Sequence, residues 1–269
     1  MTTRPASGEL LVHEPFDYTG TALDGQNGGV GFASGWVDVP PFFGGPIELS
    51  DDGTSLQYPA GIAATPVGAR MKDASNGGLA LRSLANPIDM AAEGATYYFS
   101  ALLKKDRVLT GNAILHFDLI SSAAAGSVFL MGAGSSSNAR TGTSDDFVNG
   151  PVLDSGATYF LLSRLITHTV APDEYSLSLF KVGTDTVPTT EPALYDLTHS
   201  VDATGLADNV LVTINAAANG EFDELRIATT YAEAIAVPEP STLALGSIGM
   251  LVMLLAGGRR VSRRAGRTR

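Results

Sequence analysis

Two carboxylates near the end of the chain stand two residues apart in a strand-like segment. Glu221 and Asp223 flank Phe222, and the alternation of side chains along a β-strand puts both on one face and Glu224 on the other. Retaining hydrolysis of a glycosidic bond uses two carboxyl groups about 5–5.5 Å apart, one as nucleophile and one as acid. The pair is therefore a candidate catalytic centre, and the alternative is a solvated or loop-binding role.

A histidine and an aspartate form the other chemically interesting pair. His116 and Asp118 share one face of a predicted strand, where they form either an acid–base or metal-binding pair or an exposed polar strand face. The four histidines include no i, i+4 pair and no H-E-x-x-H motif. The absence of cysteine excludes disulfides, thiolate zinc sites and cysteine nucleophiles.

Calcium is the one cofactor for which the sequence offers ligands. Asp51, Asp52 and Asp223 could supply the hard carboxylate oxygens that calcium prefers. None of them falls in a spaced calcium-loop motif, and Asp51-Asp52-Gly53 is also a good turn sequence. No other cofactor is expected.

Aromatic side chains in the early loops are candidates for contact with a glycan. Trp36 and Tyr18, together with Phe42 and Phe43, could present rings on which sugars stack. The alternative is that the single tryptophan packs in the core while Phe42 and Phe43 cap an edge of the fold. Both interpretations remain open at the level of the sequence.

The elements that must position these residues have the pattern of β-strands. Short apolar or alternating runs are separated by glycine, proline, asparagine and aspartate, with little helical periodicity. Loops are expected over 25–35, 44–53 and 132–150. The pattern predicts an all-β, two-sheet antiparallel sandwich with strands at 79–84, 96–104, 113–120, 127–132, 158–168, 174–182, 209–215 and 221–228.

Both ends of this β-rich region resemble a known domain family. Residues 10–20, 24–29 and the Gly35-Trp36 pair look like the opening of concanavalin A-like (LamG-type) jelly-roll domains, and residues 221–231 resemble their last strand. The resemblance implies one jelly-roll domain over residues 9–232 whose first and last strands pair. It also implies a surface-exposed bacterial protein.

Laminarinase-type glycosidases share the jelly-roll fold and carry alternating carboxylates on one strand. Where those enzymes present the acid, this chain has Leu225, or Arg226 if a bulge adds one residue. The departure predicts a body that is not an enzyme. A carbohydrate-binding module for extracellular polysaccharide is the main alternative to a structural role, and a glycoside hydrolase is the remote one.

Charge is divided unequally along the chain. All 28 acidic residues precede residue 241, whereas six of the 17 basic residues follow it, so residues 1–240 carry 11 basic against 28 acidic groups, a net charge of −17. Nucleic-acid binding needs a basic face that neutralises phosphates. The acidic body therefore excludes a nucleic-acid partner.

The C-terminal segment has the composition of a membrane span followed by a cationic flank. Residues 241–258 are 18 residues without a charge, and as a helix they would extend about 27 Å, enough to cross the hydrocarbon core of a bilayer. Cationic flanks stay on the cytoplasmic side. The topology is set by an arginine-rich tail, 259–269, that includes Arg259, Arg260, Arg263 and Arg264.

Pro238, Glu239 and Pro240 immediately precede this span. The order of Pro-Glu-Pro triplet, apolar helix and arginine cluster resembles the PEP-CTERM sorting signal of Gram-negative, exopolysaccharide-making bacteria. The resemblance implies recognition by an exosortase, a membrane protease, with the helix held in the inner membrane during sorting and the body delivered to the cell surface or outside.

The chain is thus predicted to have four parts. Residues 1–8 form an N-terminal segment without a recognisable signal peptide, because no apolar run of sufficient length is present. Residues 9–232 form the jelly-roll body, 233–237 a spacer, and 238–269 the sorting signal. The expected function is that of an exported, non-enzymatic surface or extracellular-matrix protein.

Overall fold

The structure is a computed structural model that describes residues 8–39, 46–50, 52–62, 68–73, 77–106, 114–123, 127–134, 137–215 and 220–235. The described residues all fall within one compact unit that ends at Ile235. The Pro-Glu-Pro motif, the predicted span 241–258 and the arginine tail all lie outside the described residues. Within the described ranges, no helix has the length and apolar character needed to span a membrane.

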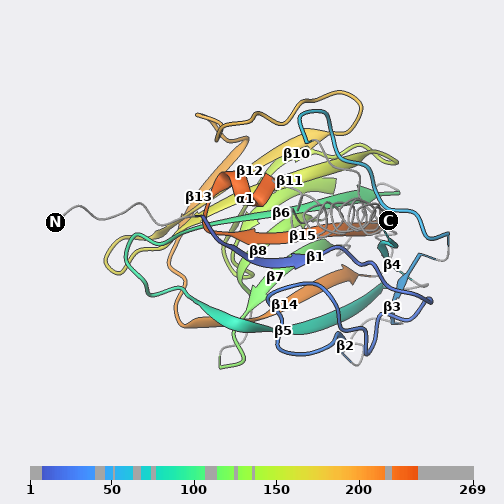
Figure 1. Ribbon diagram of the computed structural model, residues 1–269. Helices are drawn as coiled ribbons and strands as arrows, with labels where there is room; N and C mark the ends of the chain where they lie inside the picture. Colours follow the sequence, from blue (N-terminus) through green and yellow to red (C-terminus); the bar gives the residue numbers. More distant parts are fainter. Residues whose placement is uncertain are drawn as a thin grey trace, which may run out of the picture. The chain divides into compact units, whose positions relative to one another are not determined.

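The first sheet gathers strands from both ends of the body (Figure 1). Its spatial order is β13 (Leu197–Val201), β12 (Asp173–Lys181), β11 (Thr158–Ile166), β6 (Thr96–Lys105), β15 (Gly220–Ala228), β4 (Met71–Asp73) and β3 (Ile47–Leu49). One edge of β15 pairs with β6, and the other edge is shared by β4 and β1 (Leu10–Glu14). The expected pairing of first and last strands is therefore observed.

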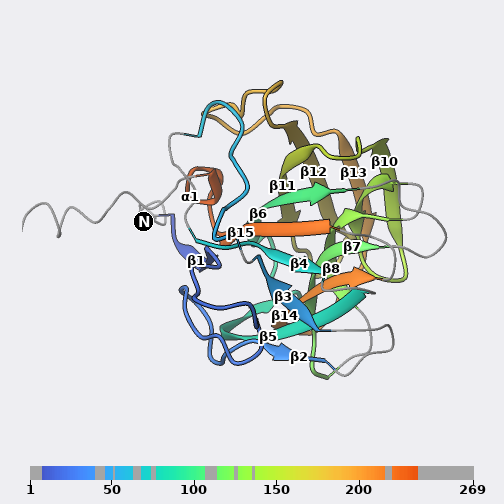
Figure 2. The same ribbon diagram turned by 90° about the vertical axis from the view of Figure 1, so that its right-hand side faces the viewer.

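The second sheet is also antiparallel and packs against the first (Figure 2). Its order is β10 (Phe147–Val152), β9 (Asn138–Gly142), β8 (Ser127–Ala133), β7 (Leu115–Ile120), β14 (Leu206–Asn215), β5 (Gly77–Asp89) and β2 (Val37–Asp38). The predicted all-β architecture of two antiparallel sheets is confirmed.

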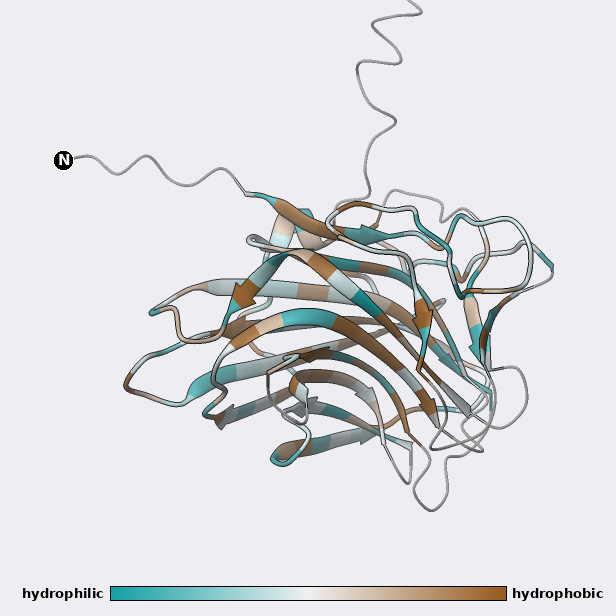
Figure 3. Cartoon of the chain, turned by 90° about the horizontal axis from the view of Figure 1, so that it is seen from below, coloured by the Kyte–Doolittle hydropathy of each residue, from teal (hydrophilic) through white to brown (hydrophobic). Residues whose placement is uncertain are grey.

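The core lies between the two sheets and is built from alternate residues of their strands. Apolar and polar residues change places along the strands, as the banded colouring of Figure 3 shows. Phe99 of β6 stacks on Phe129 of β8 with 4.0 Å between ring centroids, and Phe129 stacks on Tyr175 of β12. The Tyr175 hydroxyl donates to the Val128 carbonyl over 2.8 Å. The aromatic stack therefore joins the two sheets directly.

A second apolar cluster covers the outer face of the first sheet. Leu102, Phe160 and Ala228 point away from the core and pack with Leu56, Val187 and the helix α1 (Tyr231–Ile235). Ser100 donates to the Ala234 carbonyl over 2.7 Å. Residues 233–235 thus belong to the body, which corrects the predicted spacer at 233–237. These residues pack on the first sheet because Tyr231 and Ala234 share the buried side of one helical turn.

The eight predicted strands all occur, with ends shifted by a few residues. Leu115, Phe117 and Leu119 form part of the core as expected, and so do Val210, Val212 and Ile214. Two predicted loops were wrong in part. The segment 44–53 contains β3, and 132–150 contains β9 and the first part of β10. These strands have three to six residues and lack a long apolar alternation, so pairing with neighbouring strands holds them in place.

Candidate functional site

A row of polar side chains crosses the outer face of the second sheet. Antiparallel pairing places Thr213 of β14 opposite His116 of β7, His116 opposite Gly132 of β8, and Gly132 opposite Arg140 of β9. Asp118 lies two residues along β7 from His116, on the same face. Four strands that are distant in the sequence thus bring these groups together.

A hollow lies in this row of polar side chains. Within the row, Gly132 has a φ of +155°, and a Cβ there would lie 2.1 Å from the Leu115 carbonyl oxygen, so only glycine fits this backbone. The hollow, called the His116 cleft below, has a volume of about 250 Å³. It is lined by Ile114, His116, Asp118, Ser127, Leu130, Arg140, Ser144, Phe147, Leu211 and Thr213.

Arg140 and Phe147 form the wall of the His116 cleft. The Arg140 guanidinium lies over the Phe147 ring, 4.4 Å from its centroid, and its Nε donates to Asn149 Oδ1 over 2.8 Å. These contacts from β10 hold the long arginine side chain in one position. The wall is therefore held in place and carries a positive charge beside the floor of the cleft.

Burial shifts the pKa values of both ionisable groups on the floor of the cleft toward their neutral forms. Burial, assisted by the charge of Arg140, lowers the pKa of His116 to about 3. Burial raises the pKa of Asp118 to about 7, although hydrogen bonds with Ser127 and Thr213 oppose the shift. Among the described residues His116 Nε2 has no hydrogen-bond partner. The floor thus offers a neutral imidazole and a carboxyl group that is half protonated near pH 7.

The sequence placed His116 and Asp118 on one face, and the structure does so. The expected exposed polar strand face is wrong, because both residues are buried. The missed members of the site are Arg140 and Thr213. Thr213 lies between the predicted core positions Val212 and Ile214, so its outward direction could have been read from alternation. Arg140 lay in a segment that was predicted to be a loop.

The proposed glycan contact of Trp36 is wrong, because its side chain is only 1% exposed. Its Nε1–H donates to Glu14 Oε2 over 3.0 Å, and its ring stacks on Phe16. The alternative, a tryptophan packed in the core, is the observed arrangement. Phe42 and Phe43 lie outside the described residues.

Tyr18 belongs to the same buried network. Its hydroxyl donates to Glu14 Oε2 over 2.7 Å and accepts from Arg82 Nη1 over 3.0 Å. Burial and the Glu14 carboxylate raise the pKa of Tyr18 to about 12. The ring remains half-buried, and its contact with a saccharide stays a prediction.

Glu221 is committed to ion pairs on the outer face of the first sheet. Its Oε2 lies 2.9 Å from Arg70 Nε and 3.2 Å from Lys104 Nζ, and Arg70 also binds Asp52. The carboxylate therefore joins three strand and loop segments. This is the loop-binding role that the sequence left as the alternative to catalysis.

Asp223 sits at a β-bulge where β15 changes partners. The register shifts between Asp223 and Arg226, and Glu224 adopts φ +52°. Asp223 accepts hydrogen bonds from the backbone N–H groups of Leu56 and Glu224, over 2.8 and 2.9 Å. Burial, followed by the charge of Glu224, raises its pKa well above the usual range.

The bulge also redirects Glu224, which was predicted to project away from Asp223. The Glu224 carboxylate accepts from Tyr58 over 2.8 Å and lies 3.0 Å from His13 Nε2. Tyr58 packs on Phe160 of the outer cluster. Glu224 therefore lies beneath the loop that also covers Asp223, and strict alternation fails because the bulge inserts one residue.

The calcium candidates are separated by their structural partners. Asp52 forms two hydrogen bonds with Arg70, over 2.8 and 3.0 Å, which hold its pKa below the usual range. Asp223 is bound to backbone N–H groups as described, and Asp51 lies outside the described residues. In the described part of the chain, no three histidine or acidic side chains gather as a metal-binding group. Calcium binding stays a prediction.

No protein-family model and no curated protein matches the chain. Solved structures with a similar fold include domain 4 of AbnA, an extracellular arabinanase from Geobacillus stearothermophilus, in complex with arabinotriose, at 15% identity and TM-score 0.43 over 86% of this chain and 99% of that one. The lectin UEA-II complexed with galactose has 11% identity and TM-score 0.41 over 70% and 92% of the two chains. At these values the likeness is one of loose fold similarity and does not extend to function.

Proposed function

We propose that this chain is an exported, non-enzymatic protein of the bacterial surface or extracellular matrix that binds extracellular polysaccharide. Its concanavalin A-like jelly-roll body would hold a saccharide in the His116 cleft. The observation that carries the proposal is the floor of this cleft, where His116, Asp118 and Thr213 are buried around a hollow. The neutral His116 lacks a partner for Nε2 among the described residues.

A hydroxyl-rich ligand suits this floor. Buried polar groups without partners are costly, and a sugar hydroxyl can donate to an imidazole nitrogen and accept from a protonated carboxyl. The cavity of about 250 Å³ is smaller than the roughly 300–1,000 Å³ of pockets that enclose drug-sized molecules. One sugar unit of a longer chain therefore fits better than a large cofactor.

The non-enzymatic part of the proposal rests on the number of acids in the cleft. Glycoside hydrolysis by the common mechanisms needs two carboxyl groups on either side of the bond. Asp118 is the single carboxylate among the described residues that line the His116 cleft. Glu221 and Asp223 lie on the other sheet and are engaged by Arg70, Lys104 and Leu56.

Delivery to the surface would use the C-terminal signal. Pro238, Glu239 and Pro240 would be read by an exosortase, and the arginines after residue 258 would hold the end of the apolar segment in the cytoplasm. This part of the proposal is supported by the order of the three sequence features. The acidic body is compatible with soluble extracellular life.

Loss of one hydroxyl in the cleft should weaken saccharide binding. We expect Thr213→Val to reduce affinity by up to about tenfold, because one hydrogen bond contributes roughly 0.5–1.5 kcal/mol. Affinity electrophoresis of the full chain in mild detergent, through gels containing β-glucan, arabinan, xylan or galactomannan, measures this change. Thr169→Val, an exposed threonine on a distant loop, is the matched control and should migrate like the unmodified chain.

Two results would contradict the proposal. Equal retardation of the unmodified chain and Thr213→Val would show that the saccharide does not bind in the His116 cleft. Reducing-sugar release from any of the four polysaccharides, abolished by Glu221→Gln, would replace the non-enzymatic function by glycoside hydrolysis.

Replacing Pro238, Glu239 and Pro240 by alanine should stop processing at the sorting signal. In an exosortase-bearing host, we expect the unmodified body to end near residue 240 in the surface or extracellular fraction and the triple variant to stay uncut in the membrane. Intact mass and fractionation report both properties. Equal processing of the two chains, or of the unmodified chain in a host without exosortase, would refute the sorting proposal.

A further inference from the structure

Two hollows lie next to each other on the outer face of β12 in the first sheet. Side chains two residues apart share a strand face, and the outward positions of β12 are Glu174, Ser176, Ser178 and Phe180. Glu174 and Ser176 line one hollow of about 500 Å³, and Ser178 and Phe180 line the other, of about 550 Å³. We call the two together the β12 trough.

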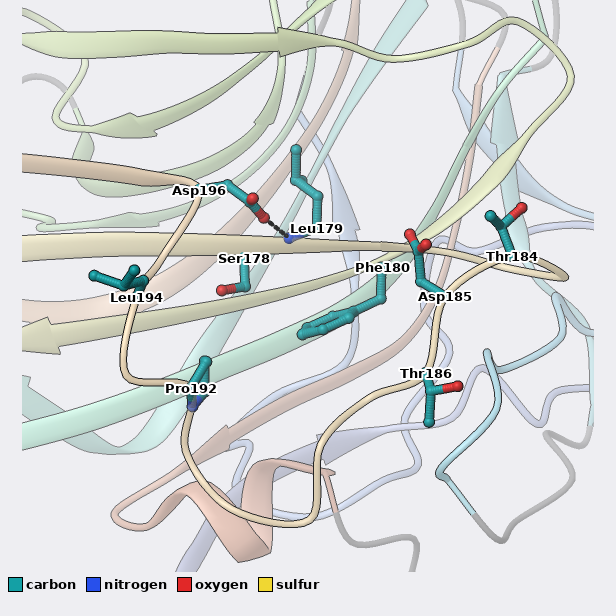
Figure 4. A pocket seen from close by; sticks show the side chains of 9 residues that line it. All are labelled: Ser178, Leu179, Phe180, Thr184, Asp185, Thr186, Pro192, Leu194 and Asp196. Carbon is teal, nitrogen blue, oxygen red and sulfur yellow. Dashed lines mark hydrogen bonds between the residues drawn. The ribbon is translucent and has the colours of Figure 1, made fainter.

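The hollow at the end of β12 combines an aromatic face with polar groups (Figure 4). The half-buried ring of Phe180 leans on Phe160 at 6.4 Å between centroids. The loop after β12 contributes Pro192 and Leu194 to the opposite wall. Asp196 Oδ2 accepts from the Leu179 N–H over 2.8 Å, which fastens this loop to the strand.

The neighbouring hollow is bounded by Arg164 of β11 and by β13. Arg164 Nη1 donates to Glu191 Oε1 over 2.7 Å, and its guanidinium lies over the Tyr195 ring, 4.9 Å from the centroid. Thr198 and Ser200 pair with Ser176 and Glu174 across the strands, so their hydroxyls stand beside the serine on the same face. The Arg164 wall of this hollow is thus held in place, and the floor formed by β12 and β13 is rich in hydroxyls.

Ser176 and Ser178 are the residues that point to a ligand. Both are at least 97% buried, and each lines one of the two hollows. Hydroxyls at the base of a concave surface can donate hydrogen bonds to, and accept them from, a bound molecule.

The backbone chemistry of β12 favours a saccharide over a peptide strand. The strand pairs with β11 along 174–181 on one edge and with β13 along 173–177 on the other. Beyond β13, the N–H groups of Leu179 and Lys181 are bound by the Asp196 and Asp185 carboxylates, so they are not available to an added strand. A ligand must bind through hydroxyls and through the Phe180 ring. Glu174, Asp185 and Asp196 contribute negative charge, which disfavours an acidic chain.

We propose that the β12 trough is a second saccharide site, which takes several consecutive units of a neutral polysaccharide. The strand from Glu174 to Phe180 extends about 20 Å. The proposal rests on saccharide binding by the body and deepens it. Because the trough and the His116 cleft lie on the outer faces of opposite sheets, one body would hold two polysaccharide chains and cross-link them.

The test removes hydroxyls from one site at a time in the full chain in mild detergent. Ser176→Val with Ser178→Val targets the trough, Phe180→Leu removes its ring while keeping bulk, Thr213→Val targets the cleft, and Thr169→Val is the control. Isothermal titration with hexasaccharides of β-glucan, arabinan, xylan and galactomannan gives stoichiometry. Light scattering with the corresponding long polysaccharides gives cross-linking, and circular dichroism checks folding.

We expect two bound hexasaccharides per chain, reduced to one by the trough double variant. Phe180→Leu should weaken the binding of one of the two hexasaccharides about tenfold. Cross-linking should weaken when either site is changed. A single bound hexasaccharide whose affinity falls with Thr213→Val alone would overturn the trough site and leave the cleft site intact. A single one whose affinity falls with the trough variants alone would overturn the cleft site and leave the trough site.

The proposed trough site would be refuted if no variant weakened saccharide binding. It would also be refuted if none of the four probes bound. Binding of an acidic oligogalacturonate in preference to the neutral probes would contradict the predicted ligand class. A peptide library that binds the trough in place of the saccharides would also refute it.

Discussion

Replacing Arg82 by methionine is expected to lower the free energy of unfolding by about 3–5 kcal/mol, the cost of leaving a buried charge without its partner. Arg82 and Glu14 are 1% and 0% exposed and form an ion pair between β5 and the end of β1. Methionine keeps much of the side-chain volume, so the loss is mainly electrostatic. Urea unfolding at pH 7 measures it.

Arg82 also organises the loop between β1 and β2. Its Nη2 donates to Asn27 Oδ1 and to the Gly28 carbonyl over 3.0 and 2.6 Å, and its Nε donates to the Ser34 carbonyl over 2.8 Å. The loop closes over a guanidinium that stacks on Phe32. We therefore expect amides of residues 26–35 to lose hydrogen-exchange protection in the variant.

Arg164→Met is the matched control for the Arg82 variant. Arg164 pairs with Glu191, but the two side chains are 25% and 32% exposed, and exposed pairs contribute about 0–1 kcal/mol. The difference between the losses in free energy of unfolding of the two variants gives the effect of burying the ion pair. Equal destabilisation by Arg82→Met and Arg164→Met would show that the buried network does not hold the loop.

Asp118→Asn should stabilise the body at pH 8 by at most about 4 kcal/mol, because the pKa of Asp118 is about 7 in the folded state against 3.8 in the unfolded one. The folded state keeps the proton while the unfolded state loses it. The contribution of Asp118 to stability is thus full below pH 4 and is lost as the pH rises to about 7. Asparagine copies the protonated form and removes this loss.

His116 changes the stability of the fold with pH in the opposite direction. Its pKa is about 3 in the folded state against 6.5 in the unfolded one, so the unfolded state binds the extra proton and stability falls as the pH drops from 6.5 to 3. Between about pH 4 and 6.5, the changes in the free energy of unfolding caused by Asp118 and by His116 have opposite signs and cancel. In Asp118→Asn only the His116 effect remains, so the free energy of unfolding should rise by about 1.4 kcal/mol per pH unit in that range.

Urea unfolding of the unmodified chain and of Asp118→Asn from pH 4 to 8 tests this prediction. The difference between them removes the contributions of other titrating groups, such as Asp173 and Asp223, that are common to both. The Asp118→Asn substitution also brings a new amide group into the cleft, so Thr213→Val serves as a control for an altered cleft without an altered charge. A constant difference between the chains across the range would contradict the pKa assignment for Asp118.

Alternation along single strands was predictable from the sequence. Leu115, Phe117 and Leu119 were placed in the core because one face of an antiparallel strand is buried, and this is a property of neighbouring residues. The same rule failed at Glu224, where the bulge adds a residue to β15. It also missed β9, whose sequence Asn138–Gly142 lacks apolar periodicity.

The candidate sites depended on contacts that no local pattern contains. The His116 cleft is lined by residues of β14, β7, β8 and β9, which are far apart in the sequence. The Glu14–Arg82 pair joins residues 68 positions apart. Burial of Trp36, which excludes it from glycan contact, follows from the same loop closure.

The sequence by itself determined the β-strand pattern, the acidic character of the body and the three features that make up the predicted C-terminal sorting signal, because each follows from the order and composition of neighbouring residues. Tertiary structure alone decided which polar side chains are buried and which line a hollow, because register between distant strands and the solvent exclusion that shifts the pKa values of His116 and Asp118 arise only when the two sheets pack.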